Sequence, residues 1–353
     1  MLKILVVNLG STSTKVAYYE DTTAVAGENI KHSKEIVQKE MIDQIEDRMK
    51  AVNNFLSAND LSPEMLDVVS ARGGLLKPIQ GGTYEVNSEM VEDVKTFKYG
   101  KHASNLSTMI AYEYQQQYGV KAFITDPVVV DELIDPVRMT GIKGIERISI
   151  FHALNQKAVA RKYAESISKK YDELNLIVVH MGGGITAGAH MQGRVIDVNN
   201  GLAGDGPMSP TRAGTLPSSE FAKYIIDNAL SYDEVYNILS RGSGFISLAG
   251  TEDALEIEKK ALNGDRESIE IYEAAAVQIA KEIGSRAAVL KGNVDAILFT
   301  GGLAYSNYLI DMITPYISFI AETKVYPGEK EMEALALGAY RVMTGTEEVQ
   351  TYT

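Results

Sequence analysis

The chain has 353 residues, 45% hydrophobic and 23% charged, which is typical of a globular protein and excludes disorder over most of its length. A formal charge of −13 argues against a general nucleic-acid binder or a protein of anionic membrane surfaces. The absence of cysteine excludes disulfides and thiolate chemistry and fits a cytoplasmic protein. At roughly 150 residues per domain, the length predicts two domains.

The first segment predicts a strand, a tight turn and a second strand. Residues 4–7 and 15–19 are β-rich, and residues 10–14 between them read Gly-Ser-Thr-Ser-Thr. Backbone N–H groups in such a turn, with hydroxyls and a lysine, are able to hold a phosphate, and a plain β-turn explains the segment equally well. A Walker A loop is not expected because a strand follows instead of a helix.

Further elements alternate along the chain. Helices are expected at residues 35–59, 112–118, 151–168, 267–291 and 331–343, and strands at 122–125 and 295–300. Residues 200–217 hold four glycines and three prolines and predict a long irregular loop. No apolar run is long enough to span a membrane.

Residues 176–189 repeat the opening pattern of the chain. At an offset of 172 residues, the matching pairs are Val6/Val178, Val7/Val179, Gly10/Gly182, Thr14/Thr186 and Ala17/Ala189. A repeat that begins each half predicts an internal duplication. We expect one domain over residues 1–147 with the last helix, 332–353, and a second domain over residues 148–331.

Several residue types in these segments are suited to phosphate chemistry. Gly182, Gly183 and Gly184 allow a ligand to approach the backbone, and the strand expected after them argues against a dehydrogenase. The pair Gly301-Gly302 suits either a nucleotide site or a simple turn.

Charged residues in loops and at element ends add further candidates. Arg72 and Arg212 are flanked by small residues, where a guanidinium matches phosphate or carboxylate oxygens or is simply solvated. Asp126 and Glu331 stand at element ends, where a carboxylate either holds Mg²⁺ or serves the turn or helix terminus. The five histidines lack metal-ligand spacing, so no histidine metal site is expected.

Eight runs together resemble the acetate kinase family over essentially the whole chain. They are NLGSTSTK from residue 8, ARGGLLKPIQGG from 71, KHASNL from 101, DPVVVDEL from 126, SIFHALNQKAVA from 149, HMGGG from 180, DVNN from 197 and TGGLAYS from 300. The resemblance is closest to the members that act on butyrate. It implies an α/β fold of two duplicated ribonuclease H-like domains, the actin-like ATPase architecture, with a central nucleotide cleft.

Motif matching within this resemblance also implies roles for individual residues. Asn8 and Lys15 are expected near the transferred phosphoryl group, and Asp126 and Glu331 at the metal. The phosphate loops are expected to contain Ser11, Ser13, His180, Gly182, Gly183 and Gly184. Arg72 and Arg212 match the active-site arginines, and Gly301 and Gly302 match the nucleotide-binding turn.

The chain departs from the family pattern at two places. Acetate kinases follow a Phe-His pair with a run that ends in a histidine near the phosphoryl group, whereas Gln156 stands there after Phe151-His152. His152, Asn155 or Gln156 is therefore expected to make that contact. Gly73 and Gly74 replace two valines, which predicts a larger acyl pocket, bounded also by Phe151 and His152.

The expected activity is Mg²⁺-dependent transfer of phosphate from ATP to a short-chain carboxylate, with butyrate preferred to acetate. A carboxylate is ionised at neutral pH, so direct in-line transfer needs no general base. The alternatives are a kinase of branched acids (isobutyrate or isovalerate) and a non-catalytic nucleotide switch of the actin or chaperone type. The resemblance further implies a homodimer or larger homo-oligomer in the cytoplasm, without nucleic-acid or membrane partners.

Overall fold

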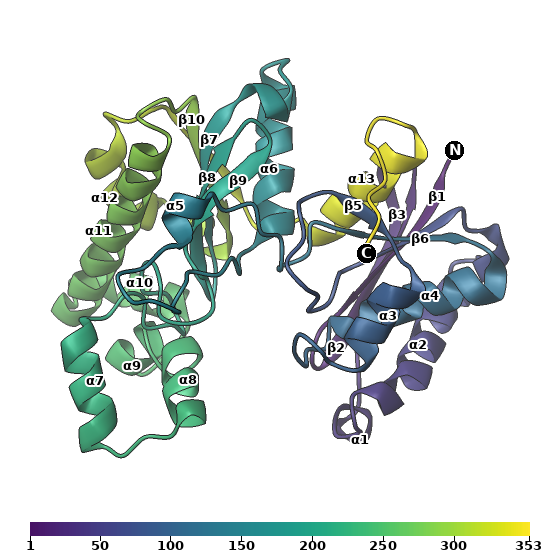
Figure 1. Cartoon of the computed structure of the whole chain (residues 1–353), viewed down its shortest axis with the longest axis horizontal. Helices are drawn as coiled ribbons and strands as arrows, with labels where there is room; N and C mark the ends of the chain where they lie inside the picture. The colour runs from purple at the N-terminus through teal and green to yellow at the C-terminus, as the bar shows by residue number, and fades with distance from the viewer. The chain divides into compact units, whose positions relative to one another are not determined.

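The computed structural model describes residues 1–353, and the chain divides into two compact units (Figure 1). Unit 1 comprises Met1–Val130 and Lys330–Thr353, and unit 2 comprises Asp131–Glu329. Residues 131–147, which we expected in the first domain, pack with unit 2. Glu132 there accepts a hydrogen bond from the N–H of Val195 (2.6 Å), and Arg147 lies 2.8 Å from Asp197.

Unit 1 is built on a six-stranded sheet in the order β3-β2-β1-β4-β6-β5. The strands are β1 (Lys3–Leu9), β2 (Ser13–Glu20), β3 (Thr23–Lys31), β4 (Val68–Ala71), β5 (Thr83–Glu85) and β6 (Lys121–Thr125). Strands β1, β2 and β3 form an antiparallel meander, whereas β4 and β6 continue the sheet in parallel from β1. Near-continuous apolar runs such as Ile4–Val7 fit strands that are covered on both faces.

Helices cover the two faces of this sheet (Figure 1). Leu5, Val7 and Leu9 belong to a core shared with α2 (Ile45–Ala58) and α4 (Asn105–Tyr118). The opposite face meets α13 (Glu331–Met343), where Ser70 Oγ donates to the carbonyl of Leu335 at 2.7 Å. Helix α13 packs so closely that a Cβ atom at Gly338 would lie 2.6 Å from Thr125 Cγ2. Helices α1 (Lys34–Val37) and α3 (Ser88–Lys95) complete the unit.

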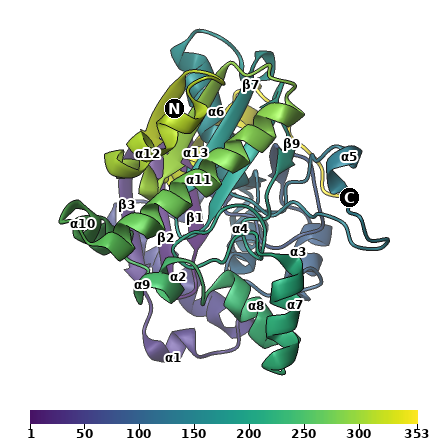
Figure 2. The same ribbon diagram turned by 90° about the vertical axis from the view of Figure 1, so that its left-hand side faces the viewer.

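Unit 2 contains a five-stranded sheet in the order β11-β10-β7-β8-β9. Its strands are β7 (Asn175–Met181), β8 (Ile185–Met191), β9 (Arg194–Val198), β10 (Ala296–Gly301) and β11 (Thr323–Pro327). Ile177 and Val179 pack in a core with α11 (Arg266–Val289) and α12 (Asn307–Ile317), and Figure 2 shows α11 crossing the strands. Leu176 and Val178 pack on the other side with α6 (Ala153–Ser166).

Five shorter helices lie between these elements in unit 2. They are α5 (Asp135–Arg138), α7 (Ser218–Asp227), α8 (Tyr232–Ser240), α9 (Phe245–Ala249) and α10 (Ala254–Leu262). None of the helices of either unit combines the length and the apolar character that a membrane span requires.

The two sheets share one topology, as the predicted duplication requires, but their first hairpins differ in length. The turn of unit 1 is closed by the pair Leu9 and Thr14, and that of unit 2 by Met181 and Ile185. With β1 and β7 aligned at the offset of 172, Thr14 therefore corresponds to Ile185. The ungapped matches Thr14/Thr186 and Ala17/Ala189 were wrong by one position, because the second turn is one residue shorter.

Most predicted elements are confirmed. The expected helices at 151–168, 267–291 and 331–343 are α6, α11 and α13, and the strand at 295–300 is β10. The expected helix over 35–59 is interrupted between α1 and α2. The side-chain amide of Gln44 donates there to the carbonyls of Val37 (3.3 Å) and Lys39 (3.0 Å), so the break has its own hydrogen bonds.

Candidate active site

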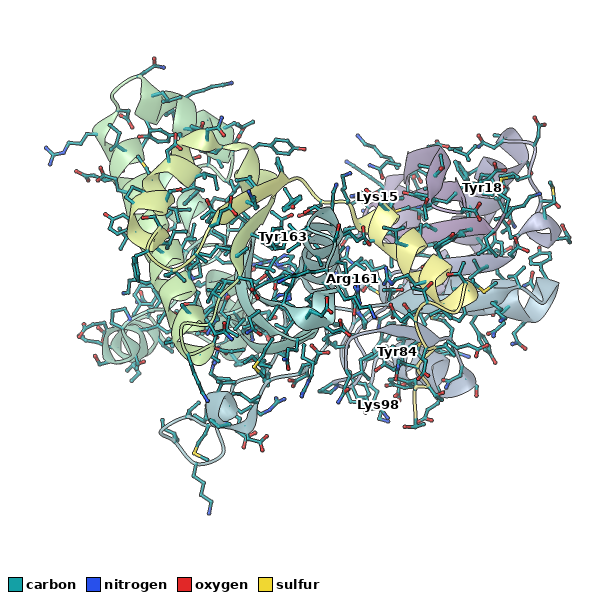
Figure 3. All side chains as sticks on the ribbon, turned by 90° about the horizontal axis from the view of Figure 1, so that it is seen from above. Lys15, Tyr18, Tyr84, Lys98, Arg161 and Tyr163 are labelled. Atoms are coloured by element: carbon teal, nitrogen blue, oxygen red, sulfur yellow. The ribbon has the colours of Figure 1, made fainter.

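Four predicted residues meet at one end of the unit 1 sheet. Asn8 on β1 pairs with Lys15 on β2, so the two side chains share a face, and Figure 3 labels Lys15 beside α13. Asn8 Nδ2 donates to Glu331 Oε2 at 2.8 Å. Arg72 Nη1 lies 3.3 Å from Glu331 Oε1 and 3.5 Å from Asn8 Oδ1. The structure thus joins Asn8, Arg72 and Glu331 in one polar cluster and places Lys15 next to it, opposite Asn8.

The fold places this cluster at the carboxyl ends of parallel strands. Arg72 directly follows β4, and its N–H donates to the carbonyl of Val7 at 3.0 Å. Glu331 is the first residue of α13. Ligands in open α/β sheets bind at such strand ends. Because the Arg72–Glu331 pair is partly solvated, an anionic ligand can replace the carboxylate at the guanidinium without a large desolvation cost.

Asp126 directly follows β6, at the same edge of the sheet. Its φ of 40° is left-handed, a conformation that aspartate tolerates better than most residues. The side chain is buried, and Oδ1 accepts a hydrogen bond from the N–H of Gly82 at 2.8 Å. The turn thus holds a carboxylate rigidly beside the strand that precedes Arg72.

Neither unit offers a complete coordination shell for a metal ion, because no group of three histidine, aspartate or glutamate side chains converges. The two separate carboxylates Asp126 and Glu331 fit a Mg²⁺ ion that is held mainly by phosphate oxygens and water, as this ion usually is in nucleotide sites.

Gly73 and Gly74 do not enlarge a pocket. A Cβ atom at Gly73 would lie 2.7 Å from Pro127 Cβ and 3.0 Å from Ile124 Cδ1. At Gly74 it would lie 2.6 Å from Asn105 Oδ1 and 2.7 Å from Asn105 Cα. The space that two valines would occupy is therefore filled by other parts of unit 1. The reasoning from these glycines to a longer acyl chain was wrong.

In unit 2, two predicted histidines stack at the carboxyl end of β7. The rings of His152 and His180 lie 3.7 Å apart between centroids and are nearly parallel, at 8°. His180 Nδ1 bonds to Asn155 Oδ1 at 2.7 Å, and its Nε2 lies 3.1 Å from Glu329 Oε1. His180 occupies the β7 position that corresponds to Asn8 on β1, and each contacts the first turn of a helix, α6 or α13.

Gln156 is fully buried beneath this stack. Its Nε2 donates to the backbone carbonyl of Thr186 (3.0 Å) and to Thr186 Oγ1 (2.8 Å). The carbonyl contact fixes the orientation of the amide, so Oε1 accepts from His190 Nε2 at 3.0 Å. Both ends of the amide are therefore engaged inside unit 2, which argues against a contact between Gln156 and a phosphoryl group.

The same chain of hydrogen bonds determines the tautomer of His152. Thr186 is fully buried, and besides the amide N–H of Gln156, which it accepts, its hydroxyl has only His152 Nδ1 beside it, at 2.9 Å, so the hydroxyl donates its proton to that nitrogen. His152 consequently carries its proton on Nε2. At the far end, Tyr171 lies 2.6 Å from His190 Nδ1, and burial lowers the pKa of His190 well below its ordinary value, which keeps this ring neutral.

The guanidinium of Arg212 lies against the backbone of the glycine turn of unit 2. Ser209 Oγ and Thr211 Oγ1 donate to the carbonyl of Gly183 at 2.7 and 3.1 Å. A Cβ atom at Gly184 would overlap the Arg212 guanidinium and lie 3.0 Å even from its Nε. That Nε is buried without a hydrogen-bond partner, and burial lowers the pKa of Arg212, although a guanidinium remains charged.

The glycine pair after β10 divides into two different positions. Gly301 has a φ of 88°, and a Cβ atom there would lie 2.7 Å from the carbonyl carbon of Met181, so the packing of β10 on β7 requires glycine. Gly302 has open space around it. Ser11 in unit 1 is exposed, Ser13 is half-buried, and Phe151 in unit 2 is buried.

Three residues of this site escaped the sequence analysis. Glu329 beside His180 and Arg48 behind the first turn carried no recognisable motif. Thr186 was noted only as a repeat match, although it is the hydrogen-bond partner of His152 and Gln156.

Comparison with known proteins gives a consistent picture of the fold. Residues 136–311, all within unit 2, match the model of the acetokinase family. The acetate kinase of Porphyromonas gingivalis has 18% identity and a TM-score of 0.79, with coverage of 97% of this chain and 100% of that one. The acetate kinase of Entamoeba histolytica has 15% identity and a TM-score of 0.78, with coverage of 97% and 100%.

A propionate kinase from Francisella tularensis subsp. tularensis is also similar, with 19% identity, a TM-score of 0.74 and coverage of 96% and 99%. At these identities the likeness concerns the fold, and it confirms the expected α/β architecture of two duplicated domains over nearly the whole chain.

Proposed function

We propose that the chain is a carboxylate kinase of the acetokinase family, whose model matches residues 136–311, and that it transfers the terminal phosphoryl group of ATP to butyrate. The reaction is ATP + butyrate ⇌ ADP + butyryl phosphate. One carboxylate oxygen of the acid bonds to phosphorus while the bond from phosphorus to the bridging oxygen of ADP breaks. The acid is ionised at neutral pH, so no base is required.

The observation that carries this proposal is the cluster of Asn8, Lys15, Arg72 and Glu331. Two cations and an amide at the carboxyl ends of parallel strands form a receptor for a carboxylate or a phosphoryl group. Arg72 is proposed to bind the acid or the transferring oxygens, and Lys15 and Asn8 to bind phosphate. Alignment and charge stabilisation then account for most of the catalysis.

Unit 2 is proposed to carry donors of its own. Arg212 offers a guanidinium whose Nε is without a protein partner. His152 is proposed to donate from Nε2, because its Nδ1 accepts the hydrogen bond from the Thr186 hydroxyl. We therefore assign the contact with the phosphoryl group to His152 and treat Gln156 as the residue that positions it. His180, Gly182, Gly183, Gly184, Gly301 and Gly302 remain the proposed nucleotide-binding residues of this unit, and Ser11 and Ser13 those of unit 1.

Asp126 and Glu331 are the proposed protein contacts of Mg²⁺, directly or through water. When bound with ATP, this ion neutralises phosphate charge and favours departure of ADP. A homo-oligomer in the cytoplasm completes the proposal, on the strength of the sequence resemblance alone.

The choice of butyrate also rests on the sequence resemblance, since Gly73 and Gly74 no longer support it. A hydroxamate assay tests it. Protein, Mg-ATP and hydroxylamine are mixed with acetate, propionate, butyrate, isobutyrate or isovalerate, and the coloured acyl hydroxamate is measured. We expect the highest kcat/KM with butyrate. A maximum at isobutyrate or isovalerate would move the substrate to branched acids, and ATP binding without any product would favour a nucleotide switch.

A further inference from the structure

Arg48 on α2 is a buried cation without an acidic partner. Its side chain has no exposed surface and is the largest fully buried one in the protein. All its hydrogen bonds go to neutral oxygens. Burial of an arginine normally requires a carboxylate, because an uncompensated charge inside a protein is costly.

The guanidinium of Arg48 is occupied by the turn between β1 and β2. Nη1 donates to the carbonyls of Gly10 (3.1 Å) and Ser13 (3.2 Å), and Nη2 donates to the carbonyl of Ser11 (3.2 Å). Nη1 also reaches Thr14 Oγ1 at 3.3 Å. Gln44, one helical turn earlier, accepts from Nε and Nη2 at 3.2 and 2.9 Å. Arg48 therefore binds three of the four carbonyls of the turn from its inner side.

These bonds determine where the turn directs its N–H groups. The fourth carbonyl, that of Thr12, accepts from the N–H of His32 at 3.0 Å, so every carbonyl from Gly10 to Ser13 is engaged by the protein. In a trans peptide the N–H points away from the C=O of the same plane. The N–H groups of Ser11 and Thr12 donate to no protein group, and both residues are exposed. The turn thus presents free donors outward, which is the arrangement of an anion-binding nest.

We propose that Arg48 is the positioning residue and the buried counter-charge of the first phosphate site: it binds the inner side of the turn, and a phosphate of the nucleotide binds the outer side. This inference rests on the proposed function only in taking the ligand to be a nucleotide. It explains why a cation is buried without an acid, since the phosphate supplies the missing negative charge. It also explains why the turn needs no lysine of its own at its tip.

Binding measurements with three ligands of different charge test this role. The affinities of ATP, ADP and adenosine are compared in wild type, Arg48→Met and Arg48→Lys by calorimetry. We expect Arg48→Met to weaken ATP binding at least about tenfold, the scale of one charge-assisted phosphate interaction, and to leave adenosine unchanged. Arg48→Lys keeps the charge but not the fork, so its loss should be intermediate. Val52→Ala, one turn later on α2, is the matched control: it removes buried apolar contacts from α2 and should leave ATP affinity unchanged.

Wild-type ATP affinity in a folded Arg48→Met protein would overturn the proposal, as would equal losses for ATP and adenosine. Amide exchange in the wild-type protein keeps the test decisive if that variant does not fold. ATP should slow exchange at Ser11 and Thr12 but not at Gly10, whose N–H already donates to Ser13 at 2.9 Å. Unchanged exchange at Ser11 and Thr12 in the ATP complex would overturn the proposal as well. Protection of these amides without acyl hydroxamate formation would instead refute the proposed kinase activity and leave the role of Arg48 intact.

Discussion

Replacement of Gly184 by alanine should displace the arginine of unit 2 without removing it. Gly184 is not in the left-handed region, and the three atoms nearest to a methyl group there all belong to the Arg212 guanidinium. Because atoms in contact lie about 3.5–4 Å apart, the guanidinium must move by roughly 2–3 Å. If Arg212 binds the phosphoryl group as proposed, a shift of that size predicts a loss of at least about 100-fold in kcat, with the loss from deleting the arginine as its upper limit.

The hydroxamate assay with saturating butyrate and ATP measures this loss, and calorimetry with ADP measures nucleotide binding separately. Gly284→Ala on α11 is the matched control because it makes the same substitution at a helical glycine that has open space around it. It should turn over normally. In a double-mutant cycle, Gly184→Ala and Arg212→Ala should not add, because both act through one guanidinium. Normal turnover of Gly184→Ala, or full additivity, would refute the assignment.

Three more outcomes are expected. Gln156→Leu should lower kcat about tenfold with little change in the KM for ATP, because the proton of His152 is no longer fixed on Nε2; kinetics at several pH values check this, and an unchanged kcat would contradict it. Gly74→Ala should lower the melting temperature by forcing a clash with Asn105, without changing the preference between butyrate and acetate; a stable variant that now prefers acetate would restore the pocket argument. Unfolding free energy should fall as pH drops below 6.5, because the folded chain keeps the pKa of His190 well below that value while the unfolded chain does not, so the unfolded chain binds the extra proton. The slope from this residue is at most about 1.4 kcal/mol per pH unit. His190→Gln should remove that part of the slope in urea titrations between pH 7 and 5.5, and equal slopes in both proteins would contradict the explanation.

The sequence predicted the elements that follow from hydrophobic periodicity and the residues that stand in motifs. Helix α13 and strand β10 were found in this way because their apolar pattern and their glycine or acidic ends are local signals. Asn8, Arg72 and Glu331 could be nominated one by one, but their convergence depends on strand order and on which unit takes the last helix. No local pattern contains that information.

The predictions were wrong where close packing between distant segments determines the role of a residue. Gly73 and Gly74 were interpreted as a sign of a larger acyl pocket, whereas Pro127 and Asn105 fill the space beside them. Such contacts join segments that are far apart in the chain, so the sequence does not reveal them. Gln156 was named, with His152 and Asn155, for the contact with the phosphoryl group because of its place in a motif. Its burial among Thr186 and His190 shows that an amide next to a buried histidine serves that histidine first.

The membership of α13 in unit 1 also affects how the protein is made. All six strands of the unit 1 sheet are synthesised before Val130, whereas the helix that covers the face of Ser70 and Thr125 emerges last. At ordinary elongation rates the nascent sheet waits roughly 10–45 s for that helix. Glu331 arrives with it, so a polypeptide released early lacks the carboxylate that joins Asn8 to Arg72. The cluster therefore assembles only after the last helix has been synthesised.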